Sequence, residues 1–217
     1  MTPLRGHDLV ITVGGDGTFL RTASHLKTNQ LILGINSVPE VSTGALCAIK
    51  INEFSQIVPQ LMNGDYKIFK MPRIAIHING KKLPIEAIND VLFTNGSPAA
   101  TSRYIISFKR KCEEHKSSGI WISTASGSTA AIHAAGGTIQ KKNDDRLQLL
   151  VREPYQGIYN PYKITRLFLK KNEKVSLISK MIKSSIYLDG PTTHCQILYG
   201  DHITFSRSTR NVHTIKF

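Results

Sequence analysis

The sequence has few of the features that mark secreted, membrane-spanning or zinc-binding proteins. It contains only three cysteines, Cys47, Cys112 and Cys195, which are odd in number and far apart. Because this spacing fits no zinc motif, we interpret them as reduced thiols of an intracellular protein. No apolar run is long enough to span a bilayer, and no hydrophobic segment follows Met1–Arg5. We therefore expect no signal peptide, no membrane partner and a cytoplasmic location.

Acidic residues are scarce as well. The chain has 15 of them against 28 lysines and arginines, which gives a net charge of +13. Such a surface attracts polyanions, including nucleic acid, acidic lipid and nucleotides. The basic residues are denser in 103–116 and 163–183, but they accompany neither an RNP-type aromatic signature nor a helix-turn-helix pattern. We expect no nucleic-acid partner, and either a solvated basic surface or a patch for phosphate-rich ligands.

The N-terminal part of the chain has the pattern of an α/β segment. Leu9–Val13 and Leu31–Ile35 are aliphatic runs typical of buried strands. A helix-like stretch, Phe19–Leu26, lies in the connection between them, which is too long for a hairpin. The two strands should therefore be parallel. Asn52–Met62 has the pattern of a second amphipathic helix, with Phe54, Ile57, Val58 and Leu61 on one face.

After Lys67 the pattern changes to that of a β domain. Arg73–Ile78 alternates weakly, and Asn79-Gly80 is a hairpin turn signal. Thr129–Ala135 is the one helix-like stretch in this part. The strand-like runs that follow the turn are Ala87–Phe93, Tyr104–Phe108, Gly119–Ser123, Leu147–Val151, Val175–Ile178, Ser185–Leu188, Ile203–Ser206 and Val212–Ile215.

The sequence thus predicts an α/β plus all-β fold. We expect a small Rossmann-like α/β domain over residues 1–68, a mostly β domain over 69–200, and C-terminal strands over 201–217 that return to the first domain. A sheet of two parallel strands is too small to stand alone. Either the later chain completes this sheet, or the sequence lacks an N-terminal strand and helix and is a fragment or a shortened isoform.

The strongest functional motif is Gly14-Gly15-Asp16-Gly17-Thr18, between the first strand and its helix. Glycines let the backbone approach phosphate closely, and the first amides of a helix are unpaired. The motif is neither a Walker A loop nor a Gly-x-Gly-x-x-Gly fingerprint. Its carboxylate is unusual, because an acid beside phosphates is repelled unless it holds a cation or takes a proton. The alternative is a tight turn with Asp16 as a helix-capping acid.

Three further segments place polar groups where a ligand could use them. Asn36 follows the second strand at the sheet edge where open α/β sheets bind ligands. Asn89-Asp90 is a polar pair in an apolar run, and an asparagine offers the donor and acceptor that an adenine edge requires, although buried asparagines also hold turns. Ser123–Ala131 alternates hydroxyl and small residues, which favours either a ligand against the backbone or a flexible serine-rich loop.

Together, these motifs resemble those of the NAD kinase family. Gly14–Thr18 resembles its phosphate motif, Asn89-Asp90 its Asn-Glu/Asp pair, and Ser126–Ala130 its serine/threonine-glycine-rich motif. The resemblance covers nearly the whole chain, and Ser117-Ser118-Gly119 and Leu188-Asp189-Gly190 are most similar to the plant NADH kinase branch. The first motif alone is shared with diacylglycerol kinases, sphingosine kinases and phosphofructokinases.

The resemblance implies an ATP-dependent kinase that phosphorylates the 2′-hydroxyl of the adenosine ribose of NAD or NADH. Asp16 would be the general base that takes the hydroxyl proton. Asn89 and Asp90 would bind the adenine and ribose of the dinucleotide. Mg²⁺ would arrive with ATP, without a metal site in the protein. The remaining nucleotide-binding positions implied are Gly14, Gly15, Gly17, Thr18, Asn36, Ser126, Thr129 and Ala130.

The sequence also departs from the family pattern. Ser118 stands where many relatives have an acid, Ala131 stands where many have a tyrosine, and the segment from Asn36 to Gly44 is short. The family implies a homodimer. Two alternatives remain, a lipid kinase of the diacylglycerol or sphingosine type and a truncated nucleotide-binding remnant without activity.

Overall fold

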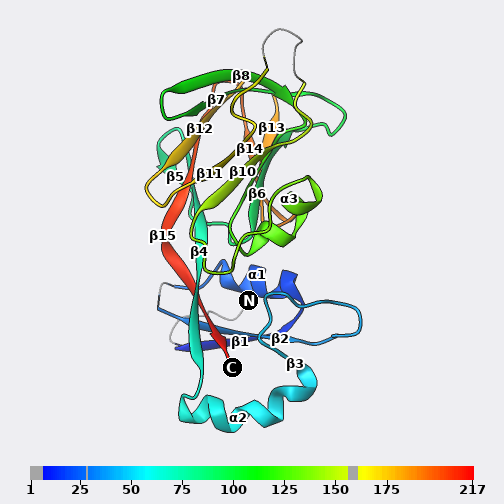
Figure 1. Cartoon of the computed structure of the whole chain (residues 1–217), viewed down its shortest axis with the longest axis vertical. Coiled ribbons are helices and arrows are strands. Elements are labelled where there is room, and N and C mark those ends of the chain that lie inside the picture. Colours follow the sequence, from blue (N-terminus) through cyan, green and yellow to red (C-terminus); the bar gives the residue numbers. More distant parts are fainter. Residues whose placement is uncertain (1–6, 28, 156–160) are drawn as a thin grey trace. The chain divides into compact units, whose positions relative to one another are not determined.

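The computed structural model describes residues 7–27, 29–155 and 161–217. The chain divides into two compact units: residues 1–72 with 210–217 form unit 1, and residues 73–209 form unit 2. Two long strands, β4 (Lys67–Ile78) and β15 (His202–Lys216), each contribute residues to both units (Figure 1). Unit 1 mixes helices with parallel strands and unit 2 consists largely of strands, which confirms the predicted fold class.

Unit 1 is built on parallel strands. β1 (Leu9–Gly14) pairs in parallel with β2 (Leu31–Asn36), as predicted. The end of β15 also pairs in parallel with β2, through His213 and Thr214. The short strand β3 (Ile49–Lys50) pairs with the end of β2. The later chain therefore extends the sheet that the first two strands begin.

Two helices cover opposite faces of these strands (Figure 1). α1 (Asp16–Ala23) lies on the side of Gly34, where a Cβ atom would meet the Phe19 ring at 2.9 Å. α2 (Phe54–Asn63) follows the 3-10 turn η1 (Ile51–Glu53) and covers the other side, where it packs against the next residues along β2. This alternation is the period of two that a strand imposes on its side chains. Only part of the predicted α2 face is covered, because Val58 is 36% exposed.

The first helix begins earlier than the sequence predicts. It starts at Asp16 and not at Phe19, because the carbonyl oxygen of Gly15 accepts the amides of Thr18 and Phe19. It ends at Ala23, before the predicted Leu26. Within the glycine motif, Gly14 therefore ends β1, Gly15 caps the helix, and Asp16–Thr18 belong to the first helical turn.

Unit 2 is a sandwich of two sheets. The first contains parts of β4 and β15 with β5 (Lys81–Lys82), β7 (Ser102–Phe108), β8 (Lys111–Ser117) and β12 (Lys174–Ser179). The second has the order β11 (Arg166–Leu169), β10 (Leu147–Val151), β9 (Ile120–Ser123), β6 (Asp90–Asn95), β13 (Ser184–Leu188), β14 (Thr193–Ile197). The 3-10 turn η2 (Gly127–Thr129) and the short helix α3 (Ala131–Ala134) follow β9.

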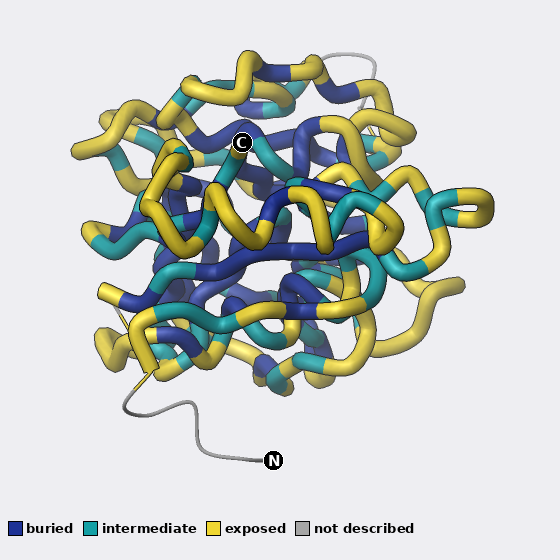
Figure 2. Tube along the Cα trace, turned by 90° about the horizontal axis from the view of Figure 1, so that it is seen from below, coloured by how far each residue is buried: buried dark blue, intermediate teal, exposed yellow. Residues whose placement is uncertain are grey.

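One hydrophobic core lies between the two sheets of unit 2. Tyr104 and Ile106 from the first sheet and Phe93 and Ile122 from the second belong to it and are fully or almost fully buried. In Figure 2, buried residues concentrate along the strands, and exposed residues occupy the turns and outer helix faces.

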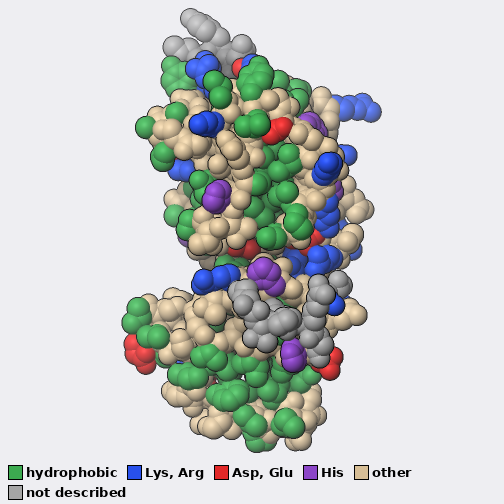
Figure 3. Space-filling model, turned by 180° about the vertical axis from the view of Figure 1, so that it is seen from behind, with side chains coloured by type: hydrophobic (Ala, Val, Ile, Leu, Met, Phe, Trp, Pro, Cys, Tyr) green, Lys and Arg blue, Asp and Glu red, His purple; other side chains and the backbone are tan. Residues whose placement is uncertain are grey.

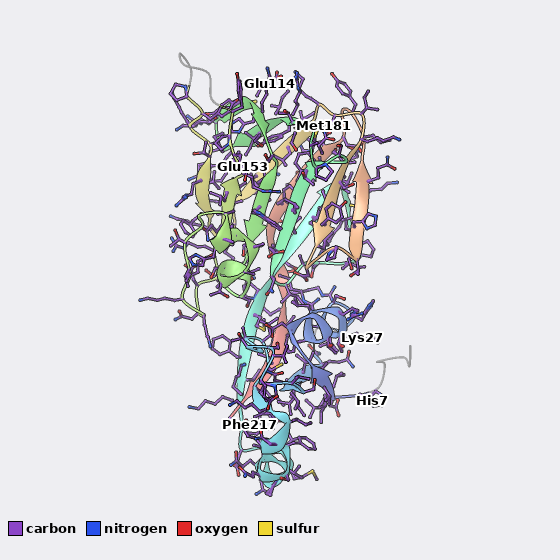
Figure 4. The ribbon with its side chains drawn as sticks, turned by 90° about the vertical axis from the view of Figure 1, so that its right-hand side faces the viewer. His7, Lys27, Glu114, Glu153, Met181 and Phe217 are labelled. Atoms are coloured by element: carbon purple, nitrogen blue, oxygen red, sulfur yellow. The ribbon has the colours of Figure 1, made fainter. Side chains whose placement is uncertain are left out.

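An ion pair joins Lys180 and Glu114, at 2.7 Å, at one end of unit 2. Figure 4 labels Glu114 and Met181, the residue after Lys180, at this end.

The strands that the sequence misses have a common position. β8, β11 and β14 all lie at the edge of a sheet, where a strand needs few apolar residues. The two predicted C-terminal strands form one continuous strand, β15, because polar residues between them make side-chain bonds that keep the chain extended, such as Ser208 Oγ to Glu86. Thr129–Ala135 divides into η2 and α3, and Asn89 precedes β6 and does not lie within it.

Candidate functional site

Asp16 is held by main-chain groups from a distant loop. Its Oδ1 accepts the amide of Leu46 at 2.8 Å, and its Oδ2 accepts that of Ala45 at 3.1 Å. As the first residue of α1, it also lies where the helix dipole favours a negative charge. A carboxylate has about four acceptor positions, so two amide bonds leave room for a donor on a ligand. This acid is therefore oriented and still able to accept a proton.

The three glycines of this motif differ in the space around their Cα atoms. A Cβ atom on Gly14 would meet the side chain of Thr18 at 2.5 Å, so close packing excludes any side chain there. Gly15 has open space except for Ser42 Oγ at 3.4 Å. Gly17 is exposed, and a Cβ atom there would meet nothing within 4 Å. Because packing does not require Gly17, its glycine suits the approach of a ligand to the helix start.

Asn36 organises the loop that reaches Asp16. Its amide nitrogen donates to Ser42 O at 2.7 Å, and its Oδ1 accepts Val38 N at 3.2 Å. Gly44 adopts φ +58, and a Cβ atom there would meet Asn36 Nδ2 at 2.5 Å, so this position also requires glycine. Asn36 also lines a pocket of about 340 Å³. Its side-chain amide thus binds its own loop on two sides.

The end of the loop is fixed at Cys47. Lys216 Nζ donates to Cys47 O at 3.0 Å, and the thiol lies 3.7 Å from Gly14 O. Burial raises the pKa of the Cys47 thiol, and the negative charge of Asp16 raises it further. The thiol is therefore a neutral neighbour of the acid and not a second anion at neutral pH.

In unit 2, Asn89-Asp90 forms a turn against the serine-rich segment. Asn89 O accepts Thr124 N at 2.9 Å and Ser123 Oγ at 3.1 Å. A Cβ atom on Gly127 would collide with Asn89 O, so the two motifs are packed backbone to backbone. The side-chain Oδ1 of Asn89 is buried and has no hydrogen-bond partner among the residues that the structure describes. A buried acceptor of this kind needs a donor, such as an exocyclic amine of a base.

Asp90 is an acid in an unfavourable place for charge. It is 7% exposed, and burial raises its pKa to about 7, with the nearby charge of Asp189 as the second cause. Both protonation states are therefore populated near neutral pH. Buried acids with such shifts cluster at functional sites.

The serine-rich segment is ordered by its own hydroxyl groups. Thr124 Oγ1 donates to Ile88 O at 2.6 Å and accepts Ser126 N at 3.1 Å. Ser128 Oγ donates to Ala125 O at 2.7 Å and accepts Gln140 N at 2.9 Å. These bonds make Thr124 and Ser128 structural. Ser126 is partly exposed and Thr129 and Ala130 are exposed, so these three remain open to a ligand.

The predicted site residues fall into two sets. Unit 1 contains Gly14–Thr18 and Asn36, and unit 2 contains Asn89-Asp90, Ser126, Thr129 and Ala130. Within each unit the structure brings the predicted segments together. Among residues 7–27, 29–155 and 161–217, no group of three or more His, Cys, Asp or Glu side chains is arranged to hold a metal ion.

Sequence comparison identifies relatives along nearly the whole chain. Residues 4–66 match the family model of the ATP-NAD kinase N-terminal domain. The probable NADH kinase of rice, Oryza sativa subsp. japonica, is 32% identical over 94% of this chain and 69% of its own length. The NADH kinase of Arabidopsis thaliana is 33% identical over 94% of this chain and 71% of its own length. The chain belongs to the NAD kinase family.

The fold agrees with this membership. The crystal structure of yeast NADH kinase complexed with NADH superposes with a TM-score of 0.83 at 19% sequence identity. The match covers 97% of this chain and 62% of the yeast chain, so this chain spans less than two thirds of that NAD kinase family member. The resemblance to the family that the sequence motifs predict is confirmed, and neither the family model nor the relatives support the lipid-kinase alternative.

Sequence reasoning missed several residues that build this NAD kinase family site. The loop amides of Ala45 and Leu46 carry no side-chain signal and could not be found by motif. Thr124 lies in the serine-rich segment, and nothing in the sequence distinguishes its hydroxyl from those of its neighbours. Asp189 belongs to the triplet Leu188-Asp189-Gly190, and its carboxylate accepts the amides of Asn89 and Asp90 directly.

Proposed function

We propose that this protein is an NAD(H) kinase that transfers the γ-phosphoryl group of ATP to the 2′-hydroxyl of the adenosine ribose of NADH or NAD⁺. The observation that carries the proposal is the pair of amide bonds that orients Asp16 at the start of α1. Family membership supports the reaction class, and this geometry supports Asp16 as the base that the reaction needs.

In this reaction Asp16 takes the proton of the 2′-hydroxyl, and the resulting oxygen forms a bond to the γ-phosphorus. The bond between that phosphorus and the β–γ bridging oxygen breaks, and ADP leaves with the electron pair. Gly14, Gly15 and Gly17 bind phosphate oxygens at the helix start through backbone amides. Thr18, whose own amide donates to Gly15 O, binds them through its hydroxyl group. A general base contributes ~10²–10⁴-fold, and positioning contributes most of the rest.

The residues that we propose bind the dinucleotide belong to unit 2. The unpaired Oδ1 of Asn89 accepts the exocyclic amine of adenine, and Asp90 binds a ribose hydroxyl. Ser126, Thr129 and Ala130 lie against the adenine and diphosphate, and Asn36 in unit 1 belongs to the nucleotide-binding set through the loop it holds. Mg²⁺ arrives with ATP and neutralises phosphate charge.

The test is phosphorylation of NADH by purified protein with ATP and Mg²⁺, followed as NADPH. Asp16→Asn should lower kcat by ~10²–10⁴-fold without loss of the fold, because its amide oxygen can still accept one loop amide. Asp65→Asn, an exposed acid in the same unit, is the matched control and should keep wild-type activity. An unchanged rate in Asp16→Asn would contradict the assignment of the base. A chain that binds NADH without turnover would indicate the inactive remnant.

We further propose that the protein is a homodimer. Leu92, Trp121 and Tyr187 lie directly opposite one another across β9, β6 and β13, on the face that points away from the sandwich core. All three are partly exposed, and hydrophobic side chains are visible in groups on the surface of unit 2 in Figure 3. Trp121→Lys should shift sedimentation from dimer to monomer, and a wild-type monomer would contradict the proposal.

A cytoplasmic location remains part of the proposal. All three cysteines are free, as expected of a protein in a reducing compartment. In the described parts of the chain, no helix has the length and apolar character needed to cross a bilayer. Fractionation of cells that express a tagged chain would test the location, and recovery with an organelle would contradict it.

A further inference from the structure

Asp189 occupies the hairpin between β13 and β14 with unusual backbone geometry. It has φ +50, and Gly190 after it has φ +117. Asp-Gly is a common pair for such turns, because both positions need positive φ. The turn alone would be satisfied by Asn-Gly or Gly-Gly, so it does not explain why this position carries a carboxylate turned inward.

The carboxylate of Asp189 binds three consecutive amides. Its Oδ1 accepts Ile88 N at 3.0 Å, Asn89 N at 2.7 Å and Asp90 N at 3.1 Å, and its Oδ2 accepts Ile88 N at 2.8 Å. In return, Asp189 N donates to Asp90 O at 3.0 Å. Consecutive amides that converge on one point form an anion-binding nest, and here a side chain about one hundred residues away fills it.

This contact determines where Asn89 and Asp90 lie. Their amides are bound by Asp189 on one side, while Asn89 O is bound by Thr124 N and Ser123 Oγ on the other. The backbone of the turn is therefore fixed from two directions. The side-chain Oδ1 of Asn89 has no partner among the described residues.

The same contact places two carboxyl groups close together. The charge of Asp189 is a cause of the raised pKa of Asp90, after burial. Burial also raises the pKa of Asp189, but the three amides and the positive charge of Arg73 on β4 act in the opposite direction. On balance the pKa of Asp189 is also raised, but the amide hydrogen bonds favour its ionised form over that of Asp90, whose pKa is raised to about 7.

We propose that Asp189 is a positioning residue for the dinucleotide, which holds Asn89 and Asp90 in their binding geometry through three backbone amides. The proposal rests on the proposed function for its substrate. The Asp189 carboxylate and the amides of Ile88, Asn89 and Asp90, together called the amide clamp, all lie in unit 2.

The experiment compares Asp189→Asn with wild-type protein. Asparagine keeps the shape and one accepting oxygen but removes the charge and places an NH₂ group against the Ile88 amide. Asp201→Asn is the matched control, because Asp201 also accepts a turn amide in this unit, that of Leu198 at 2.8 Å. Equilibrium binding of NADH is measured by its fluorescence from pH 5.5 to 8.5, and the Asp90 carboxyl is titrated by ¹³C NMR, assigned with Asp90→Asn.

We expect NADH to bind roughly tenfold more weakly to Asp189→Asn at all pH values, as for one lost charged hydrogen bond. The KM for ATP should stay within about twofold of the wild-type value, because the clamp acts only on the residues that we propose bind the dinucleotide. The Asp90 titration should move from about 7 downward by about one pH unit or more, since a neighbouring negative charge is removed. A purely structural role would weaken the fold without moving this titration.

Each failure has its own signature. If the Asp90 pKa and the NADH affinity of Asp189→Asn equal those of wild type and of Asp201→Asn, the proposed clamp is overturned, whatever the kinase activity is. Should Asp189→Asn not fold, Asp189→Glu, which keeps the charge but displaces it, must still weaken NADH binding, and unchanged binding overturns the proposal. Weaker NADH binding with the expected titration in a protein that forms no NADPH would instead reject the proposed function and leave the clamp standing.

Discussion

Asp16 Oδ1 accepts the main-chain amide of Leu46 at 2.8 Å, across thirty positions of sequence. The acid that the motif singles out is thus fixed by a loop that has no motif of its own. The loop in turn depends on Asn36, whose amide holds Ser42 O, and on Lys216, which holds Cys47 O. The orientation of Asp16, the proposed base, therefore depends on three separate segments of the chain.

Replacement of Asn36 should therefore affect Asp16 at a distance. Asn36→Ala leaves Ser42 O and Val38 N without their partner, which should cost about 1–3 kcal/mol of unfolding free energy. We expect kcat for NADH phosphorylation to fall by roughly tenfold or more, because the loop that orients Asp16 loosens. Urea unfolding and initial rates measure the two effects. Asn63→Ala, at the exposed end of α2, is the control, and equal behaviour of the two variants would contradict this role.

Gly17 should separate stability from activity. Since a Cβ atom there would meet nothing within 4 Å, Gly17→Ala should stabilise α1 by about 0.5–1 kcal/mol. The same methyl group would occupy space at the helix start where we propose that phosphate binds, so kcat/KM for ATP should fall by about tenfold or more. Thermal unfolding tests the expected gain in stability, and steady-state kinetics test the expected loss in kcat/KM. A stable variant with full activity would show that no ligand approaches this position.

Substitution of Gly127 by alanine should lower the stability of the fold, in contrast to the same substitution at Gly17. A Cβ atom there collides with Asn89 O, and the clash involves backbone that Asp189 holds on its other side. Gly127→Ala should therefore destabilise the fold by about 1–3 kcal/mol and weaken NADH binding together. Ser126→Ala removes a neighbouring hydroxyl without this clash and should keep the stability. If Gly127→Ala unfolds at the same denaturant concentration as wild type, the packing of the two motifs is not as described.

Ionisation of the buried Asp90 carboxyl group should lower the free energy of unfolding as pH rises. Its folded-state pKa, about 7, exceeds that of an unfolded aspartate, so the folded protein binds more protons between about pH 4 and 7. Stability from this group is therefore present below pH 4 and lost as pH rises to 7. Asp90→Asn should be more stable than wild type by up to roughly 4 kcal/mol at pH 8 and nearly equal to it at pH 4.

Urea unfolding at pH 4, 6 and 8 measures this slope, with the exposed Asp145→Asn as the control. A stability difference between Asp90→Asn and wild type that does not change with pH would refute the buried titration. NADH binding should weaken in the same variant, because it loses the carboxyl group that we propose binds a ribose hydroxyl.

The sequence was informative where a local pattern has a local cause. Two aliphatic runs predicted β1 and β2 and their parallel pairing, because a connection of that length forces a crossover. Asn79-Gly80 predicted the β4–β5 hairpin, since both residues adopt positive φ. Edge strands such as β8 were missed, because a strand with one paired side needs little apolar character.

By itself, the sequence determined the family, the fold class and the reactive candidates, because glycines, acids and hydroxyls at fixed spacing report local chemistry. The tertiary structure decided how those candidates are held. Backbone amides at 45 and 46 orient Asp16, and the carboxylate of Asp189 fixes Asn89 and Asp90. Main-chain amides are the same in every residue except proline, so only the folded chain reveals which of them converge on a carboxylate.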